Sequence, residues 1–369
     1  MSAALTHSIM QTSKIAVFTN PNTELELRSV PVLFPGDGEI LVKIEYTTLC
    51  GSDLKTYTGA RREKTPTILG HEIVGRIAAF GPGALHVDQR GDRLSIDDLI
   101  TWAIYCSEPD SDLARKGIPQ KGPGLFKYGH EQLTPTCGLH GGLAEFVLLR
   151  KHTPIVKFQK QIPLPVIAPV NCAVATIAGA FRLAGDVSGK NVLVSGVGML
   201  GVVACAMARS KGAKLVAALD LDPQRLETAL RFGANLALLS DADIPEALRE
   251  TAGFDRPIDL IIECSGVPEV MSAGLKWLGI GGTAIWVGAT YPAAPVAVDA
   301  EYLLRNLLTI KGLHNYNAGD LVSAVEFMEQ YHSEFPFAAL IYDGFRLTEV
   351  NEAFSYAVQQ RPYRVGITI

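Results

Sequence analysis

The sequence predicts an α/β protein of two domains, one rich in β-strands and one built on a doubly wound parallel sheet. A chain of 369 residues exceeds what one hydrophobic core usually supports, so two domains are expected. Residues 1–168 hold short apolar runs separated by Gly and Pro, which is typical of β-structure. Residues 169–310 alternate strand and helix patterns, as βαβ units do, and residues 311–369 return to mixed structure that we expect to complete the first domain.

In the first domain, strands are expected over residues 14–18, 39–46 and 72–80, with a further strand over 364–369 at the end of the chain. The segment 97–135 is polar and rich in Gly and Pro. Loops of this length inside a compact domain usually serve a function, so we expect a long functional loop there.

The second domain is expected to open with a helix over residues 171–183. Strand and helix patterns then alternate, which predicts a parallel sheet. The expected strands are 191–195, 214–219, 260–263 and 283–287, and the expected helices are 202–209 and 223–232.

The composition limits which cellular compartment and which binding partners are expected. A hydrophobic content of 48% and a charged content of 19% fit a soluble globular protein. The net charge of −5 gives no general attraction to nucleic acid or to an anionic membrane. The sequence shows no secretory signal and no apolar run long enough to span a bilayer, and its six cysteines are widely spaced. We therefore expect a cytoplasmic protein with reduced thiols, no nucleic-acid partner and no membrane partner.

A glycine-rich motif predicts a dinucleotide site. Residues 196–201 read GVGMLG, follow an apolar strand and precede a helix, and Asp220 ends the next strand. Gly196, Gly198 and Gly201 would allow the backbone to approach a pyrophosphate at the helix N-terminus. The Asp220 carboxylate would accept hydrogen bonds from both ribose hydroxyls of NAD and would repel the 2′-phosphate of NADP. Arg225 lies close enough in sequence to complicate this preference for NAD. These five residues are the predicted NAD-binding residues.

Two short motifs and a distant cysteine predict a metal site. Cys50 begins the run CGSD, and His71 lies in the run GHE. Thiolate and imidazole ligands suit zinc, and a catalytic zinc site needs a third protein ligand and keeps one open position. Cys172 is the candidate third ligand; a single cysteine in an apolar stretch is otherwise usually a packing residue.

Taken together, several motifs resemble the zinc-dependent medium-chain dehydrogenase (alcohol dehydrogenase) family, from about Lys14 to the C-terminus. The motifs are CGSD at 50–53, GHE at 70–72, GGLAEF at 141–146, the segment around Cys172, and GVGMLG at 196–201. The resemblance implies a GroES-like β-barrel catalytic domain and a Rossmann NAD-binding domain. It also implies a zinc alcohol dehydrogenase that transfers a hydride reversibly from an alcohol to NAD, giving an aldehyde or ketone. Homodimers or homotetramers joined through the edge of the nucleotide-binding sheet are a further implication.

The resemblance also implies the metal-site roles. Cys50, His71 and Cys172 would bind the catalytic zinc, and Glu72 would be an auxiliary metal ligand. Asp53 would orient His71 through its second ring nitrogen.

Three further residues have implied roles in the reaction. Ser52 would take the proton of the alcohol, and Arg364 would reach the cofactor phosphates. Lys55 stands where some relatives have a histidine that relays the proton to water, so that relay is open in this chain.

A second, structural zinc is not expected. Many relatives bind it through four closely spaced cysteines in a lobe whose register in this chain follows from RKGIPQKG at 115–122. The four positions carry no cysteine: they are Glu108, Ser111, Ala114 and Gly122. Cys106 and Cys137 do not restore the spacing. We expect one zinc per chain.

Shorter motifs resemble a subgroup of phosphonate-catabolism-associated alcohol dehydrogenases; they are KYGHE at 127–131, GIPQK at 117–121 and KGLHNY at 311–316. Arg61, Arg62 and Lys64, joined by His130, could bind a phosphonate or a carboxylate on the substrate. The alternative is a solvated charge run on a loop.

Two other functions are compatible with parts of the sequence. A zinc-free quinone or enone reductase on the same fold would lack Cys50, His71 and Cys172, whereas all three are present. A non-catalytic nucleotide-binding redox sensor would keep only the nucleotide site.

Overall fold

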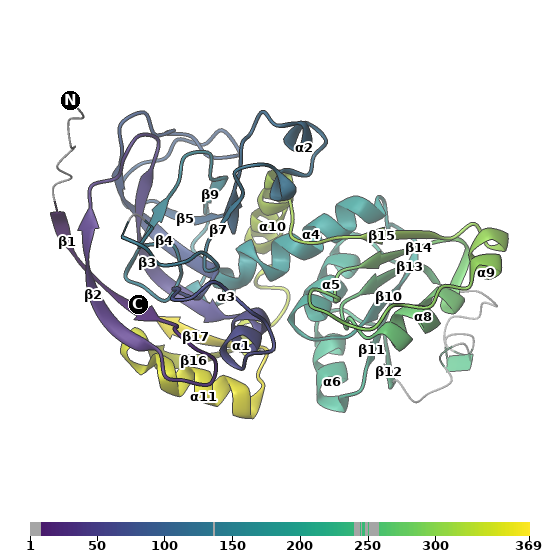
Figure 1. Cartoon of the computed structure of the whole chain (residues 1–369). Helices are drawn as coiled ribbons and strands as arrows, with labels where there is room; N and C mark the ends of the chain where they lie inside the picture. Colours follow the sequence, from purple (N-terminus) through teal and green to yellow (C-terminus); the bar gives the residue numbers. More distant parts are fainter. Residues whose placement is uncertain (1–8, 136, 240–243, 245, 248–249, 251–257) are drawn as a thin grey trace. The chain divides into compact units, whose positions relative to one another are not determined.

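The structure is a computed structural model that describes residues 9–135, 137–239, 244, 246–247, 250 and 258–369. The chain divides into two compact units (Figure 1). Unit 1 runs up to Cys172 and includes Asn317–Gln330 and Phe337–Ile369, and unit 2 comprises Ala173–Tyr316 and Tyr331–Pro336.

Unit 1 is built on a seven-stranded sheet. Its strand order is β16-β17-β3-β4-β5-β9, with β8 paired to β3. The strands are β3 (Ile40–Leu49), β4 (Glu72–Phe80), β5 (Leu99–Trp102), β8 (Phe146–Leu149), β9 (Ile155–Lys157), β16 (Ile341–Arg346) and β17 (Arg364–Thr368). Two antiparallel pairs complete the β-structure: β1 (Ile9–Val17) with β2 (Glu26–Leu33), and β6 (Tyr105–Cys106) with β7 (Phe126–Lys127).

The C-terminal strand pairs with a strand from the N-terminal part of unit 1. β17 pairs antiparallel with β3, with Val365 opposite Leu49. Val42, Ile44 and Ile77 are fully buried in one core together with Phe354 of α11 (Val350–Gln360). This burial of branched and aromatic side chains is the main stabilising contribution to the unit.

Short helices connect these strands. They are α1 (Gly51–Tyr57), α2 (Asp112–Arg115), α3 (Leu164–Ile167), α10 (Ala318–Tyr331), and the 3-10 helices η1 (Pro119–Lys121), η2 (Ala168–Asn171), η3 (Phe337–Leu340) and η4 (Leu347–Glu349). The expectation of one long loop over 97–135 is wrong in part, because this segment forms β5, β6, α2, η1 and β7. The apolar run in β5 pairs with β4 and β9 and buries Trp102 in the core.

Unit 2 is built on a six-stranded, all-parallel sheet in the order β12-β11-β10-β13-β14-β15. The strands are β10 (Asn191–Ser195), β11 (Leu215–Asp220), β12 (Leu236–Leu239), β13 (Ile258–Glu263), β14 (Leu278–Trp286) and β15 (Thr309–Gly312). The helices whose bounds lie within the described residues are α4 (Ala173–Ala184), α5 (Met199–Ser210), α6 (Pro223–Arg231), α8 (Pro268–Trp277) and α9 (Ala300–Arg305).

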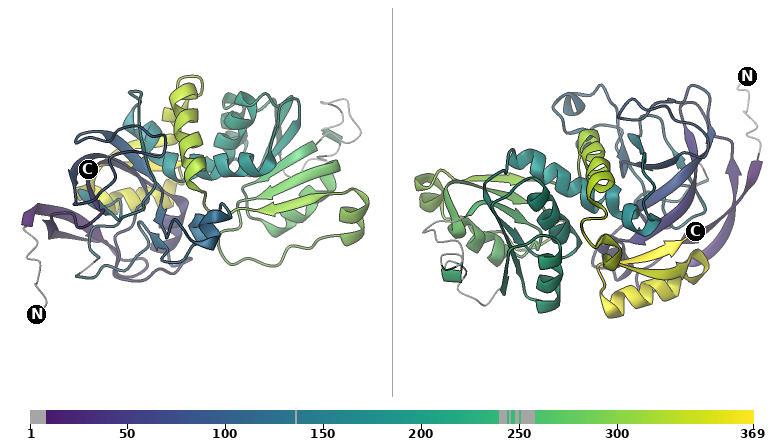
Figure 2. Two further views of the ribbon diagram at one scale, coloured as in Figure 1. Left: turned by 90° about the horizontal axis from the view of Figure 1, so that it is seen from above. Right: turned by 180° about the vertical axis from the view of Figure 1, so that it is seen from behind.

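Helices pack against this sheet from both sides, as Figures 1 and 2 show. All five residues of β10 are buried, which requires cover on both faces. The strand order reverses between β10 and β13, as in a doubly wound fold. The predicted fold class, a β-rich domain with a doubly wound parallel sheet, is therefore confirmed.

Among the described residues, no single helix has both the length and the apolar character needed to cross a membrane. One bent pair, Leu164–Asn171 with Ala173–Ala184, passes that test on length and composition alone.

Candidate active site

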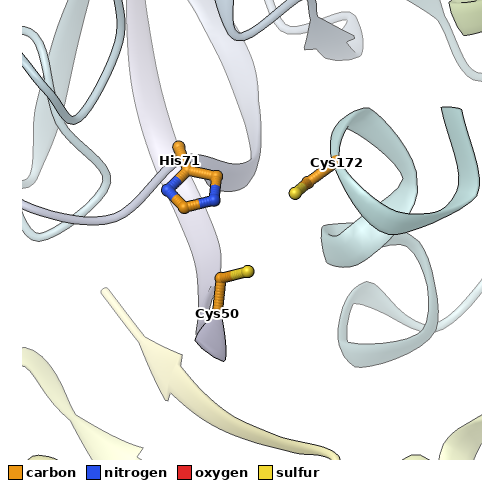
Figure 3. A group of neighbouring side chains, drawn as sticks. All are labelled: Cys50, His71 and Cys172. Atoms are coloured by element: carbon orange, nitrogen blue, oxygen red, sulfur yellow. The ribbon is translucent and has the colours of Figure 1, made fainter. Parts of the chain in front are cut away.

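Three metal-binding side chains converge in unit 1. The Sγ atoms of Cys50 and Cys172 and a ring nitrogen of His71 lie within 4.8 Å of one another (Figure 3). Cys50 directly follows β3 and His71 directly precedes β4, and these strands are antiparallel neighbours. Cys172 directly follows η2, which packs on both strands. The sequence places Cys172 in a second domain that begins at residue 169, but in the structure it belongs to unit 1 with the other two donors.

A glycine turn aims His71 at this cluster. Gly70 has φ +88°, and a Cβ there would lie 3.1 Å from the Cα of Gly142. The Gly142 amide donates to the Gly70 carbonyl at 2.8 Å, and the Leu143 amide donates to the Leu69 carbonyl at 3.0 Å. The GGLAEF motif therefore packs directly on the turn that carries His71, and both this close approach and the positive φ favour glycine at position 70. A Cβ on Gly142 would instead lie 2.6 Å from Thr47 Oγ1.

Asp53 joins the segments of the first two donors. Its Oδ2 accepts the Cys50 amide at 2.9 Å, and its Oδ1 accepts the Gly70 amide at 3.3 Å. The same Oδ1 lies 3.3 Å from Nδ1 of His71, which leaves Nε2 as the nitrogen that can bind a metal. Burial alone would raise the pKa of Asp53, but the adjacent His71 holds it below its usual value.

The two thiols of the cluster share a hydrogen bond. This bond, together with the positive charge of Arg364 and contact with His71, holds the pKa of Cys50 well below its usual value. The same bond and burial raise the pKa of Cys172 well above it. Metal binding would deprotonate both thiols, and two thiolates with one imidazole form a donor set that fits zinc.

Ser52 lies on the metal side of His71. It is the second residue of α1, and its Oγ is 3.4 Å from Nε2 of His71. A hydroxyl at this position is close enough to the metal-binding nitrogen to reach a group bound to the metal.

Glu72 and Arg364 form a buried ion pair beside Cys50. Two nitrogens of the Arg364 guanidinium lie 2.6 and 2.7 Å from the Glu72 carboxylate oxygens, and Nη2 also lies 3.5 Å from the Cys50 Sγ. Thr48 donates a further hydrogen bond to Glu72 at 2.6 Å. These contacts engage both carboxylate oxygens of Glu72 and bury Arg364 to 6% exposure. Metal binding by Glu72 and phosphate binding by Arg364 stay predictions, and the sequence did not predict this pairing.

A mixed-charge layer covers the other face of His71. The His130 ring lies with its centroid 5.0 Å from that of His71, and its Nδ1 is 3.0 Å from the Glu63 carboxylate. Arg61 pairs with the same Glu63 at 2.7 Å, and Lys64 lies 3.4 Å from Glu131. These carboxylate partners favour the interpretation of residues 61–64 as a solvated charge run over that of an anion site. Sequence reasoning missed Glu63, whose only signal was its place among basic residues.

The predicted dinucleotide loop has the close approaches that require glycine. Gly196 has φ +82°, and a Cβ there would lie 2.7 Å from the Ser265 nitrogen. A Cβ on Gly201 would lie 2.1 Å from the Gly196 carbonyl oxygen, and Gly198 precedes α5 as its N-cap. The tight loop and the amides of the α5 N-terminus suit a pyrophosphate.

An acid and a base border that loop. Asp220 ends β11, and its Oδ2 accepts the Val197 amide at 2.7 Å while its Oδ1 accepts the Leu221 amide at 2.8 Å. Arg225 on α6 places Nη1 3.5 Å from the position that a Cβ on Gly198 would take. Both predicted selectivity residues therefore lie at the loop.

The lobe that would hold a second zinc in relatives is closed by hydrogen bonds. The Ser111 side chain caps α2 by accepting the Ala114 amide at 3.2 Å. The Gly122 amide donates to Pro119 at 2.8 Å, and the Glu108 amide donates to Pro123 at 3.2 Å.

Comparison with known proteins places the chain in a family. Residues 36–160 match the family described as the alcohol dehydrogenase GroES-like domain, and residues 199–330 match the family described as zinc-binding dehydrogenase. An L-threonine 3-dehydrogenase of Streptomyces coelicolor is 32% identical over 82% of this chain and 84% of its own length. A sorbitol dehydrogenase of Bacillus subtilis is 26% identical over 96% of both chains.

Solved structures agree over the whole chain. An alcohol dehydrogenase of Thermotoga maritima has a TM-score of 0.90 at 26% identity, covering 97% of this chain and 99% of its own. A benzyl alcohol dehydrogenase of Acinetobacter calcoaceticus has a TM-score of 0.84 at 25% identity, covering 98% of this chain and 100% of its own.

A GroES-like unit with a Cys–His–Cys cluster, combined with a Rossmann sheet, defines a zinc-type oxidoreductase. The chain belongs to the zinc-dependent medium-chain dehydrogenase family, as its motifs predict.

Proposed function

We propose that this protein is an alcohol dehydrogenase that transfers a hydride reversibly between an alcohol and NAD, giving an aldehyde or ketone. The observation that carries the proposal is the cluster of Cys50, His71 and Cys172 with the Ser52 hydroxyl beside it. Metal donors and a proton-accepting hydroxyl at one place are what alcohol oxidation requires. The zinc-free reductase alternative has no use for the three donors.

One zinc ion per chain is bound by these three side chains in the proposed enzyme. When bound, it supplies Lewis acidity that makes the alcohol hydroxyl easier to deprotonate. Cys50 and Cys172 bring the two negative charges that compensate the ion. Asp53, 3.3 Å from Nδ1 of His71, keeps the proton on that nitrogen so that Nε2 presents its lone pair.

Ser52 accepts the proton that leaves the substrate hydroxyl. Lys55 lies three residues further along the same helix, so both side chains are on one face of α1. We propose that the proton leaves Ser52 along this face toward solvent. Lys55 stands where some relatives have the histidine that carries the relay, and its ammonium form has no lone pair to accept the proton.

NAD is the proposed hydride acceptor. The Asp220 carboxylate at the end of β11 would accept hydrogen bonds from ribose hydroxyls and would repel a 2′-phosphate. Arg225 beside Gly198 would instead favour that phosphate, so a comparison of NAD with NADP tests this preference directly.

The substrate is a small-molecule alcohol. Relatives are named for threonine, sorbitol and benzyl alcohol, which differ in charge and polarity. Because of the motifs near residues 117–131, anionic alcohols, including alcohols that carry a phosphonate, should be assayed as well.

We further propose a homodimer or homotetramer formed through the edge of the unit 2 sheet. β15 is the edge strand there, and Ile280, Leu304 and Leu307 near it are 64%, 70% and 71% exposed. Exposed apolar side chains at an open strand edge favour pairing with a second copy.

The test combines metal analysis with an activity screen. Protein purified without added zinc is analysed for metal, and reduction of NAD and NADP is measured with plain, polyol, amino and phosphonate-bearing alcohols. About one zinc per chain, with turnover that is lost in Cys50→Ala and kept in Cys137→Ala, supports the proposal. Cys137 is the matched control because it is a thiol of unit 1 outside the cluster. Nucleotide binding without zinc and without turnover would instead support the redox-sensor alternative.

A further inference from the structure

A buried carboxylate lies at the carboxyl edge of the unit 2 sheet. Glu263 is the last residue of β13 and is 1% exposed. In the parallel register it stands opposite Ser195, the last residue of β10. β10 and β13 are the neighbours at which the strand order reverses, and dinucleotides bind across that point in doubly wound sheets.

Glu263 holds the loop that follows its own strand. Its Oε1 accepts the Ser265 amide at 2.8 Å, the Gly266 amide at 3.1 Å and the Ser265 hydroxyl. Its Oε2 lies 3.2 Å from the Gly266 amide. Burial raises the pKa of this carboxyl, so the position is costly for a charge and is stabilised by these donors.

This loop is wedged between the loops that end the two neighbouring strands. A Cβ on Gly196, in the dinucleotide motif, would lie 2.7 Å from the Ser265 nitrogen. A Cβ on Gly266 would lie 2.6 Å from the Gly288 carbonyl oxygen, just after β14. The loops pass too closely for a Cβ to fit between them, so a shift of one loop would press on the next. A displacement of Ser265 and Gly266 would therefore move Gly196 and Gly288 as well.

We infer that Glu263 is a positioning residue for the dinucleotide, and that it acts on the half of the cofactor that carries the nicotinamide. The inference rests on the proposed NAD site. Asp220 lies on β11, so the adenosine half is bound over β10 and β11. The other half then lies over β13 and β14, where Glu263 fixes the loop. Removing the carboxylate should weaken binding of the whole cofactor more than binding of its adenosine part.

The experiment compares NADH with AMP as ligands of the full-length, zinc-loaded protein, using isothermal titration calorimetry. Glu263→Leu removes every acceptor at similar volume, whereas Glu263→Gln keeps one side-chain oxygen. We expect E263L to weaken NADH binding about tenfold or more, because two loop amides and the Ser265 hydroxyl lose their acceptor. AMP binding should weaken less than NADH binding, because AMP meets only the Gly196 loop whereas NADH also lies over β13 and β14. E263Q should recover most of the NADH affinity.

Asp259→Ala is the matched control. Asp259 lies on the same strand at the opposite edge of the sheet, where its carboxylate accepts the Asn191 amide at 2.8 Å. Its removal should lower the melting temperature and leave the ratio of NADH to AMP affinity unchanged. If E263L does not fold, Ser265→Ala removes the hydroxyl contact alone and should shift the same ratio in the same direction.

Unchanged NADH affinity in E263L would overturn the inference, and so would equal weakening of NADH and AMP, which indicates general structural damage. If Ser265→Ala has to replace E263L, an unchanged ratio of NADH to AMP affinity in that variant would also overturn the inference. Wild-type protein that binds neither ligand would overturn the proposed function itself and the inference with it.

Discussion

At the residue scale, the metal site depends on side chains that bind no metal. Asp53 accepts amide hydrogens from both ligand segments and faces Nδ1 of His71, so one carboxylate fixes the positions of Cys50 and His71 together. Groups that orient a metal ligand contribute to metal affinity because they reduce the cost of arranging the donors.

Replacing Asp53 with Asn should therefore weaken zinc binding. The amide keeps the shape but loses one acceptor oxygen and the negative charge beside His71, so we expect zinc affinity to fall by about 10- to 100-fold in a chelator competition assay. Asp88→Asn is the control, because Asp88 is also buried in unit 1 and accepts the Arg90 and Asp92 amides. Equal zinc affinity in D53N and wild type would contradict the assigned role.

The buried side chain of His140 should make the free energy of unfolding decrease at acidic pH. It is 1% exposed, neither ring nitrogen has a hydrogen-bond partner among the described residues, and burial lowers its pKa to about 4. The unfolded chain takes up the proton near pH 6.5, whereas the folded protein takes it up only near pH 4. Stability is thus unaffected above pH 6.5 and falls as the pH drops through this window, by about 3 kcal/mol in total.

His140→Phe should remove this pH dependence and raise the neutral-pH free energy of unfolding by about 1–3 kcal/mol, because two unpaired polar atoms leave the core. Chemical denaturation at several pH values between 4 and 7.5 measures both effects. His152→Asn, at an exposed histidine, should keep the wild-type slope. An acid dependence in H140F equal to or steeper than that of wild type would refute the explanation.

At the element scale, the His71 turn depends on glycine for two separable reasons. Gly70 has a positive φ and touches the backbone of Gly142, whereas Gly91 has φ +83° with nothing within 4 Å of an added Cβ. We expect Gly70→Ala to destabilise the fold by about 1–3 kcal/mol and to lower zinc affinity, since the turn must shift. Gly91→Ala should cost only the backbone strain, about 1 kcal/mol, with zinc affinity unchanged. Thermal melts with and without zinc separate the two, and equal effects would contradict the packing argument.

Local patterns explain which elements the sequence could predict. The strand, glycine turn and helix around residues 196–201 carry their own periodicity and turn residues, and the structure forms them as expected except that α5 begins at Met199, inside the motif. β5 escaped prediction because its four residues, three of them apolar, lie within a polar segment. Only pairing with β4 and β9 identifies them as a strand.

At the scale of the whole molecule, contacts between distant residues were beyond sequence reasoning. The Arg364 and Glu72 pair spans 292 positions, and the Glu63 and His130 pair spans 67. Nothing local in either segment specifies its partner. The Arg364 and Glu72 pair arises only when the sheet of unit 1 brings the C-terminal strand beside β3. The metal donors were predictable because their chemistry is specific, but the charges that surround them were not.

If the proposed oligomer forms through the edge of the unit 2 sheet, charges placed at that edge should lower the mass of the protein in solution. Leu304→Arg combined with Ile280→Arg places charges at the exposed edge of the unit 2 sheet and should shift the protein to a monomer in analytical ultracentrifugation. Leu85→Arg, at a side chain of unit 1 that is 65% exposed, is the control and should leave the mass unchanged. A wild-type monomer, or an oligomer that survives both edge charges, would contradict this interface.

The proposed enzyme holds one zinc ion through Cys50, His71 and Cys172, and X-ray absorption at the zinc edge detects these ligands. We expect two sulfur neighbours at about 2.3 Å, together with nitrogen or oxygen neighbours at about 2.0–2.1 Å. In Cys172→Ser the sulfur count should fall to one. Four sulfur neighbours, or a wild-type spectrum that survives the loss of Cys172, would contradict it.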